Sequence, residues 1–491
     1  AHVNCTRRKL AKLASNGSGL RSRHSSSDSL IEDGEREMRR PYLRETPFEK
    51  LFRFRGVIAV VSVPVCLILL VVGMMPRAHH DDIHHQFHHA QHGAASTSPY
   101  KYAIVMDAGS TGSRVHIFRF KDGSSGLELV DDTFEKLEPG LSSFADNPTG
   151  GAESLIPLIE KAVESVPGES QAATTIELRA TAGLRLLPGT KADELLKEVN
   201  VLFKKYPFKF DSSSITIMDG ADEGAFQWVT TNYLLGRMGG APSSTVAAID
   251  LGGGSVQLAY ALPQNVAAKA PAGYVRTLRG GGAAYHVYVH SYLGYGIMAA
   301  RAASIDAADG GNACIPTTFT GEYPYAGKTH NVAAATDGQD FEQCLITQTG
   351  VLHKDKACSD GSATECAFDG VWGGGGGDGL KEVYASSYLF DRAEQAGFIE
   401  KGVNSQSSPV GAFSDAAKSA CGSSDVKSEY PAVQEDHAPY FCMDLTYAHT
   451  LLSKGFGLGE ETEMTLVKRI EYKGNPIEAA WPLGAAINSL A

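Results

Sequence analysis

Short apolar segments alternate with Gly-rich turns along the chain from residue 100 onward. Residues 100–106 (YKYAIVM) and 114–120 (RVHIFRF) predict two strands, and the turn between them reads DAGSTGS. The same arrangement returns at residues 246–260, where two predicted strands flank the turn DLGGGS. Because the two strand–turn–strand units have the same form and lie about 140 residues apart, they predict an internal duplication of one domain.

Further helices and strands are expected between the two units. Residues 154–166 and 191–203 predict helices, and residues 175–178 and 214–218 predict strands. A mixture of paired strands and covering helices, present twice, is an α/β architecture.

One long apolar run precedes these elements. Residues 56–75 (GVIAVVSVPVCLILLVVGMM) carry no charge, and about 20 such residues can cross the roughly 30 Å hydrocarbon core of a membrane. Because Arg53 and Arg55 flank its N-terminal side, the positive-inside rule predicts a cytoplasmic N-terminus and a chain that crosses the membrane before residue 76. The alternatives are a buried core helix and a cleaved signal peptide, for which the run is too long and too far along the chain.

Charge divides the chain into a basic head and an acidic body. The formal net charge is -12, yet residues 1–55 carry 13 Lys/Arg and only 7 Asp/Glu. The acidic remainder argues against nucleic acid as its partner. The Ser- and Arg-rich head predicts a disordered tail, and the run HHDDIHHQFHHAQH within residues 76–98 predicts a solvated stem rather than a metal site.

Six of the eight cysteines follow the predicted membrane span. An even number of cysteines on a non-cytosolic side predicts disulfides. Sequential pairing is the working hypothesis, although six cysteines allow fifteen pairings and six buried thiols are the alternative. The chain has no Cys-x2-Cys pair, so a zinc site is not expected. The pairs in this hypothesis are Cys314–Cys344, Cys358–Cys366 and Cys421–Cys442.

The two Gly-rich turns carry groups that bind anionic oxygens. Successive backbone N–H groups in a tight turn form a nest for phosphate, and Ser110, Thr111 and Ser255 add hydroxyl groups. Asp107 and Asp250 open the two turns, and a carboxylate beside a phosphate is favourable when a divalent cation lies between them. A single turn of this kind is common in plain hairpins, whereas two matched turns predict a phosphate clamp.

Attack of water on phosphorus needs a base. Glu223, in the segment DGADEGAFQ, follows a predicted strand and begins a predicted helix, where it can orient and deprotonate a water. The alternative is a helix-start Glu favoured only by the helix dipole. The segment RATAGLR also follows a strand, and Arg179 and Arg185 suit contacts to phosphate unless they form surface ion pairs.

The order of five motifs resembles the apyrase conserved regions of the GDA1/CD39 nucleoside phosphatase family. They are DAGSTGSR (107–114), RATAGLR (179–185), DGADEGAFQ (219–227), DLGGGSVQ (250–257) and AAWPLGAA (479–486). The segment FCMDLTY (441–447) and the single predicted anchor look closest to plant-type apyrases of that family.

The resemblance implies an α/β fold of two actin-like (ribonuclease H-like) lobes that bind a nucleotide in the cleft between them. It implies that Glu223 is the catalytic base and that Ser255 and Gln257 help to hold the attacking water. It further implies that Asp107 and Asp250 hold Ca²⁺ or Mg²⁺ through water molecules, with Thr181 and Trp481 nearby, although a core role for Trp481 is the alternative. Contacts to phosphate are implied for Ser110, Thr111, Gly112, Arg114, Thr181, Gly253, Gly254 and Ser255.

The nucleoside site is less defined, because Tyr384 and Tyr388 are candidates for stacking on the base but are also ordinary core tyrosines in the alternative interpretation. The expected division of the chain is a basic cytosolic tail at 1–55, a transmembrane helix at 56–75, a His-rich stem at 76–98, lobe I at 99–220 plus 465–491, and lobe II at 221–464. The expected location is that of a type II membrane protein, with its catalytic lobes in the Golgi lumen or at the cell surface.

The expected activity is metal-dependent hydrolysis of nucleoside tri- and diphosphates to the monophosphate and inorganic phosphate. The attacking group is a water activated by Glu223, in line with the leaving group. A GDPase/UDPase of the secretory pathway is an alternative within the same family. Outside it, the alternatives are a phosphatase of polyphosphate or guanosine polyphosphates and an actin- or chaperone-like switch protein. No protein partner is implied.

Overall fold

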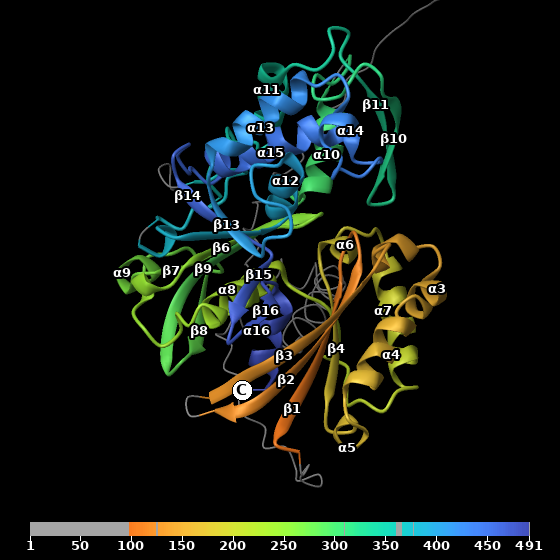
Figure 1. Cartoon of the computed structure of the whole chain (residues 1–491), viewed down its shortest axis with the longest axis vertical. Coiled ribbons are helices and arrows are strands. Elements are labelled where there is room, and N and C mark those ends of the chain that lie inside the picture. Colours follow the sequence, from red (N-terminus) through yellow and green to blue (C-terminus); the bar gives the residue numbers. More distant parts are fainter. Residues whose placement is uncertain (1–97, 124–125, 309, 360–365, 377, 491) are drawn as a thin grey trace, which may run out of the picture. The chain divides into compact units, whose positions relative to one another are not determined.

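The computed structural model describes residues 98–490 apart from 124–125, 309, 360–365 and 377, and their arrangement is drawn in Figure 1. The expected basic tail, the membrane helix and the stem up to residue 97 lie outside the described residues. Within the described part of the chain, no helix is both long and apolar enough to cross a membrane.

The first sheet is built from the first of the two predicted units. Its strand order is β3-β2-β1-β4-β5, in which β1, β2 and β3 are antiparallel neighbours and β4 and β5 run parallel to β1. The strands are β1 Tyr100–Ala108, β2 Ser113–Gly123, β3 Gly126–Leu137, β4 Thr175–Ala180 and β5 Ile215–Ile217.

The second sheet repeats the topology of the first. Its order is β13-β14-β12-β6-β7-β9-β8, and the central run β9-β7-β6-β12-β14 has the same order and the same strand directions as β3-β2-β1-β4-β5. The predicted duplication is therefore present in the strand topology. The strands are β6 Ala247–Leu251, β7 Ser255–Leu262, β8 Val275–Gly280, β9 Ala283–Leu293, β12 Val383–Ser387, β13 Ser405–Pro409 and β14 Glu463–Val467.

Two small hairpins and the helices complete the described chain. The hairpin strands are β10 Thr320–Tyr325 with β11 Lys328–Ala333, and β15 Arg469–Tyr472 with β16 Asn475–Glu478. The α-helices are α3 Pro148–Glu153, α4 Ile156–Ser165, α5 Gly168–Gln171, α6 Ala182–Arg185, α7 Lys191–Phe203, α8 Gly220–Leu234, α9 Gln264–Ala267, α10 Ile297–Ala307, α11 Phe341–Val351, α12 Tyr388–Ala396, α13 Gly411–Gly422, α14 Val426–Glu429, α15 Phe441–Thr450 and α16 Trp481–Leu490. Short 3-10 turns span Leu141–Phe144, Pro242–Ser244, Asp378–Leu380 and Ala438–Tyr440, and a π-helical turn spans Leu451–Gly455.

The first sheet has a buried core on each face, because its central strand is apolar on both sides. Ile104 and Met106 belong to the core that includes residues of α4 and α7, whereas Ala103 and Val105 belong to the core that includes residues of α16. Figure 1 shows α4 and α7 on one side of this sheet and α16 on the other. The helix predicted at residues 154–166 begins later, at Ile156, where a proline in the first turn favours helix initiation.

Helix α8 connects the cores of the two sheets. Its Phe226 and Leu234 lie in the core shared with α16, while Ala225 and Trp228 lie in the core formed with β7 and β9. A helix that is buried on opposite sides has little freedom to move, so the first turn of α8, which carries Glu223, is fixed relative to both sheets.

The two aspartates of the Gly-rich motifs lie inside strands, not at the start of turns as predicted. Asp107 pairs in register with Arg114 on β2, and Asp250 pairs with Gln257 on β7. The ladder hydrogen bonds extend beyond both aspartates, so their backbones are held in extended geometry. Each carboxylate is therefore held on a strand, which is more rigid than a loop.

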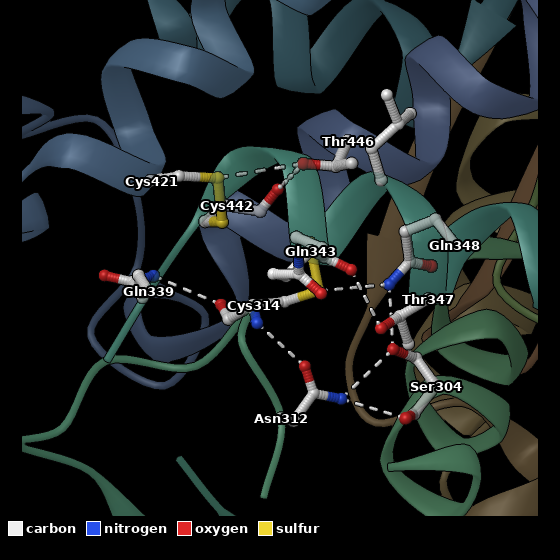
Figure 2. The surroundings of a disulfide bond; sticks show 12 residues. Ser304, Asn312, Cys314, Gln339, Gln343, Thr347, Gln348, Cys421, Cys442 and Thr446 are labelled. Atoms are coloured by element: carbon white, nitrogen blue, oxygen red, sulfur yellow. Dashed lines mark hydrogen bonds between the residues drawn. A yellow bond between two sulfur atoms is a disulfide. The ribbon is translucent and has the colours of Figure 1, made fainter. Parts of the chain in front are cut away.

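The structure has the sequential disulfide pairing, Cys314–Cys344, Cys358–Cys366 and Cys421–Cys442. Figure 2 shows the first and third of these bonds close together, and the sulfur atoms of Cys344, Cys421 and Cys442 lie within 4.8 Å of one another. Because these sulfurs are already bonded in pairs, the cluster is two neighbouring disulfides, not a metal site. These two disulfides join cysteines that are 30 and 21 residues apart in the sequence. A crosslink that closes a loop of such length contributes about 3 kcal/mol to stability.

The motif FCMDLTY contributes a buried ion triad. Asp444 on α15 accepts hydrogen bonds from Arg301 of α10, at 2.7 Å and 2.5 Å, and from Nε of Arg392 of α12 at 2.7 Å. All three side chains are at most 1% exposed. Removing one member of such a triad leaves an uncompensated buried charge, so the triad locks the three helices together.

Candidate active site

The two Gly-rich turns have the same backbone geometry. In the first, Gly109 N–H donates to the carbonyl of Gly112 at 3.1 Å; in the second, Gly252 N–H donates to the carbonyl of Ser255 at 3.0 Å. Both bonds join residues at the same distance along the chain from the motif's aspartate. The duplicated motif therefore presents two matched loops, one from each sheet.

These two loops face each other directly. A Cβ placed on Gly253 would lie 2.4 Å from Ser110 Oγ and 3.3 Å from Thr111 Cγ2. No side chain larger than hydrogen fits at residue 253 without displacing the opposite loop. Backbone and hydroxyl groups from both sheets thus converge on one small space.

Asp107 and Asp250 are buried at the mouths of the two loops. Asp107 Oδ2 accepts a hydrogen bond from Arg114 Nη1 at 3.0 Å. The Oδ1 atoms of both aspartates are buried and have no hydrogen-bond partner within the described part of the chain. Burial raises the pKa of each carboxyl group above its usual value of 3.8. Arg114 opposes the shift at Asp107, whereas at Asp250 the Ser387 hydroxyl opposes it and the charge of Asp107 increases it.

Glu223 lies close to these carboxylates and is held by side chains from two other elements. Its Oε2 accepts hydrogen bonds from Arg185 of α6 and, at 3.2 Å, from Gln257 Nε2 of β7. Gln257 also donates to Ser255 Oγ at 2.7 Å and to Ser291 Oγ at 2.9 Å. Burial raises the pKa of Glu223 from 4.5 to about 8; Arg185 opposes this shift, whereas Asp250 and Asp107 increase it. A carboxyl group with a pKa near neutrality can accept a proton during turnover and return it.

One cavity of about 1200 Å³ connects these groups. It contains ten of the expected site residues, which are Asp107, Ser110, Thr111, Arg114, Thr181, Glu223, Asp250, Gly253, Tyr388 and Trp481. Expected residues that do not line it are Gly112, Gly254, Ser255, Gln257 and Tyr384. Of these, Ser255 and Gln257 are 2% exposed and support Glu223 from behind the cavity wall.

The two nucleoside candidates occupy different places. Tyr388, at the start of α12, lines the cavity, and the guanidinium of Arg392 lies 5.1 Å from the centre of its ring. Tyr384, on β12, packs against the core that contains α16. Of the two arginines in RATAGLR, Arg185 reaches Glu223, while Arg179 binds Glu177 at 2.7 Å and lies over a core phenylalanine.

Sequence reasoning missed two serines that contact the site. Ser386 and Ser387 end β12, beside Asp250 on β6, and their hydroxyls oppose the rise in its pKa. Ser387 has φ = 60°, a conformation that costs a non-Gly residue free energy and is concentrated at functional sites. The available signal was a pair of serines in VYASSYLF, between the two tyrosine candidates.

Comparison with known proteins identifies the family to which this chain is similar. The GDA1/CD39 (nucleoside phosphatase) family model matches residues 94–491. The chain is 41% identical over 462 residues to "Probable apyrase 2" of Oryza sativa subsp. japonica, an alignment that covers 90% of this chain and 96% of the relative. It is 36% identical over 408 residues to the human "Nucleoside diphosphate phosphatase ENTPD5", covering 79% and 87% of the two chains.

Among solved structures, a nucleoside triphosphate hydrolase from Neospora caninum matches with a TM-score of 0.56. The match covers 79% of this chain and 92% of the other, at 14% sequence identity. At that identity the likeness concerns the fold alone, which is an α/β fold with two mixed sheets.

Proposed function

Since the chain belongs to the GDA1/CD39 (nucleoside phosphatase) family and is an apyrase, a nucleoside tri- and diphosphate hydrolase, we propose that it hydrolyses its substrates by direct attack of a water held by Glu223. The observation that carries this proposal is the convergence, in one cavity, of two matched phosphate-binding loops, two buried aspartates and a carboxyl group of raised pKa. The two sheets of identical strand order support an actin-like, ribonuclease H-like fold for the two lobes.

The two facing loops are the proposed phosphate clamp. Ser110 and Thr111 from one loop and Gly253 from the other bring hydroxyl and backbone groups to the same space. Donors fixed in advance on rigid hairpins stabilise the charge that develops on a transferred phosphoryl group without reorganising. The nucleoside then extends towards Tyr388, whose ring lines the same cavity and packs against the guanidinium of Arg392.

The donor set fits a divalent cation. Asp107 and Asp250 each keep one buried carboxylate oxygen without a hydrogen-bond partner among the described residues, and burial raises the pKa of both. Hard cations such as Ca²⁺ and Mg²⁺ bind oxygen ligands of this kind. We assign Asp107 and Asp250 to that ion, which when bound would neutralise phosphate charge.

Glu223 is positioned to activate the water. Arg185 and Gln257 both donate to Oε2, and Glu223 lines the cavity, so we assign its other oxygen, Oε1, to the attacking water. As the water attacks the terminal phosphorus, Glu223 takes its proton, and the bridging oxygen of the leaving, shortened nucleotide takes the electrons of the broken P–O bond. A water nucleophile requires no covalent enzyme intermediate.

A substrate panel tests the proposed function. The purified protein is expected to release inorganic phosphate from ATP, ADP, GDP and UDP when Ca²⁺ or Mg²⁺ is present, and to lose this activity with excess EDTA. Comparable kcat/KM for tri- and diphosphates supports broad apyrase activity, whereas activity confined to GDP and UDP supports the alternative preference. Phosphate release that persists in EDTA would contradict the assignment of Asp107 and Asp250 to a cation.

We also propose that residues 56–75 anchor the protein in a membrane, with the catalytic lobes on the non-cytosolic side. The three disulfides support this, because such bonds persist in oxidising compartments. Alkaline carbonate extraction of cells that express the full chain is expected to leave the protein in the membrane pellet. Release into the supernatant would contradict the anchor.

A further inference from the structure

A buried His–Asp pair lies in the cavity wall, outside the groups assigned above. His116, on β2, is 1% exposed, and its Nδ1 lies 3.0 Å from Asp132 Oδ2 on β3. Its other ring nitrogen, Nε2, is buried and has no hydrogen-bond partner in the described part of the chain. A buried polar atom without a hydrogen-bond partner costs free energy. Because His116 lines the cavity, a ligand bound in the cavity could supply the missing hydrogen bond to Nε2.

Part of the cavity wall is made by side chains of β2, β3 and the β15–β16 hairpin. Phe134 pairs with His116 across β2 and β3, with ring centres 4.9 Å apart. Glu478 lies near enough to Arg114 and His116 to stabilise their charged forms. The anion branch, as we name it, is lined by Arg114, His116, Phe134, Lys136, Arg469 and Glu478.

Among the described residues, two cationic side chains of the anion branch are already paired with carboxylates, and a third is not. Arg114 and Lys136 face each other across β2 and β3, and they pair with Asp107 and Glu138. Arg469 lies opposite Glu478 in its hairpin and forms no ion pair within the described residues.

The state of the imidazole follows from its neighbours. Burial opposes the charged form of His116, but Asp132 more than offsets it, and its pKa is raised above 6.5. In the charged ring Nδ1–H donates to Asp132, so Nε2–H is a donor directed away from that partner.

We propose that the anion branch binds the inorganic phosphate released by hydrolysis, with His116 Nε2–H and Arg469 as its donors. This proposal rests on the proposed function. The unprotonated oxygens of inorganic phosphate accept charge-assisted hydrogen bonds, which matches the N–H donors that His116 and Arg469 offer. After hydrolysis the nucleotide product still occupies the part of the cavity near Tyr388. The anion branch lies on the Asp107 side, so the released phosphate can bind there while the nucleotide product remains bound.

The test measures binding of inorganic phosphate by calorimetry to the full protein, with its divalent cation and a saturating non-hydrolysable β,γ-imido analogue of ATP. The analogue fills the phosphate clamp, so phosphate that still binds occupies another site. We expect wild type to bind phosphate under these conditions. His116→Asn, which keeps an N–H for Asp132 but lacks the Nε2 end, is expected to bind it about tenfold more weakly, as for the loss of a charged hydrogen bond.

His330→Asn is the matched control, because His330 also binds an aspartate, Asp306 at 2.7 Å, but does not line the cavity. Its phosphate affinity should equal that of wild type. Arg469→Gln, at an exposed position, tests the branch without disturbing the buried pair and should also weaken binding.

Two results would overturn the inference: undiminished phosphate affinity in both His116→Asn and Arg469→Gln, or phosphate binding by wild type only when the analogue is absent. If the analogue itself does not bind, the proposed nucleotide site is wrong. In that case, comparing phosphate binding by the free wild type and His116→Asn still decides whether the branch binds phosphate.

Discussion

Glu223→Gln is expected to lower kcat for ATP and ADP by about 10²–10⁴-fold, the range typical of a lost general base. The substituted amide can still accept hydrogen bonds from Arg185 and Gln257, which hold Oε2 in the wild type. The groups of the phosphate clamp are untouched, so nucleotide affinity should change little. Steady-state phosphate release, together with calorimetric binding of the β,γ-imido analogue, separates turnover from binding.

Asp222→Asn is the matched control for this variant. Asp222 is the preceding residue in the same first turn of α8, its side chain is 33% exposed, and it lies 3.9 Å from Arg276 rather than in the cavity. Its kcat should stay within about twofold of wild type, as for most surface substitutions. Undiminished turnover in Glu223→Gln would remove Glu223 from the mechanism.

The same variant has a pH-dependent effect on stability. Because burial raises the pKa of Glu223 from 4.5 to about 8, the folded protein holds a proton that the unfolded chain releases in this pH range. The free energy of unfolding therefore falls as pH rises from about 4.5 to 8, and a neutral glutamine avoids this loss. In EDTA, Glu223→Gln should melt at a higher temperature than wild type at pH 8, and the difference should shrink at pH 5. A constant difference at both pH values would contradict the raised pKa.

Asp250→Asn is expected to weaken activation by Ca²⁺ or Mg²⁺ by about 10–100-fold, the usual loss when a group that binds a metal through water is altered. The amide keeps the shape of the carboxylate and can still bind Ser386 and Ser387, but it removes one of the two charges that would hold the cation. Phosphate release measured against metal concentration should show a higher half-saturation point, with partial recovery at high metal concentration.

Asp391→Asn provides the comparison for Asp250→Asn. Asp391 also lines the cavity, yet its side chain is 44% exposed and lies 3.9 Å from Lys468, away from the two buried aspartates. Its metal dependence should match wild type. Equal half-saturation concentrations in Asp250→Asn and wild type would mean that Asp250 does not hold the cation.

Much of the fold follows from local pattern. The helix α7 has the bounds that its sequence predicts, Lys191–Phe203, and both Gly-rich turns connect antiparallel strands as expected. Hairpins form between neighbouring residues, so their signal is present in a short stretch of sequence. The predictions were less accurate at the ends of the elements: Asp107 and Asp250 lie within strands because the ladders extend farther than residue preferences indicate.

The candidate site was predictable where it depends on motifs and unpredictable where it depends on packing. The five motifs identified nine of the residues that line the cavity. They did not separate Tyr388, which reaches the cavity, from Tyr384, which packs into a core, because the two lie only four residues apart and have the same side chain. The anion branch could not be predicted, since β2 and the β15–β16 hairpin are distant in sequence.

The repeated Asp-x-Gly hairpins, their strands and the groups proposed to bind phosphate could be read from the amino-acid sequence, because they depend on hydrogen bonds and backbone freedom within a few residues. How those groups are combined depends on the packing of segments that are distant in the chain. This packing placed Ser110 against Gly253, brought Arg185 to Glu223, and left Asp107, Asp250 and His116 buried with atoms that lack partners among the described residues. The charge state of an ionisable group depends on its burial and on charged groups that other segments of the chain bring close to it. Neither can be obtained from the residues that flank the group in the sequence.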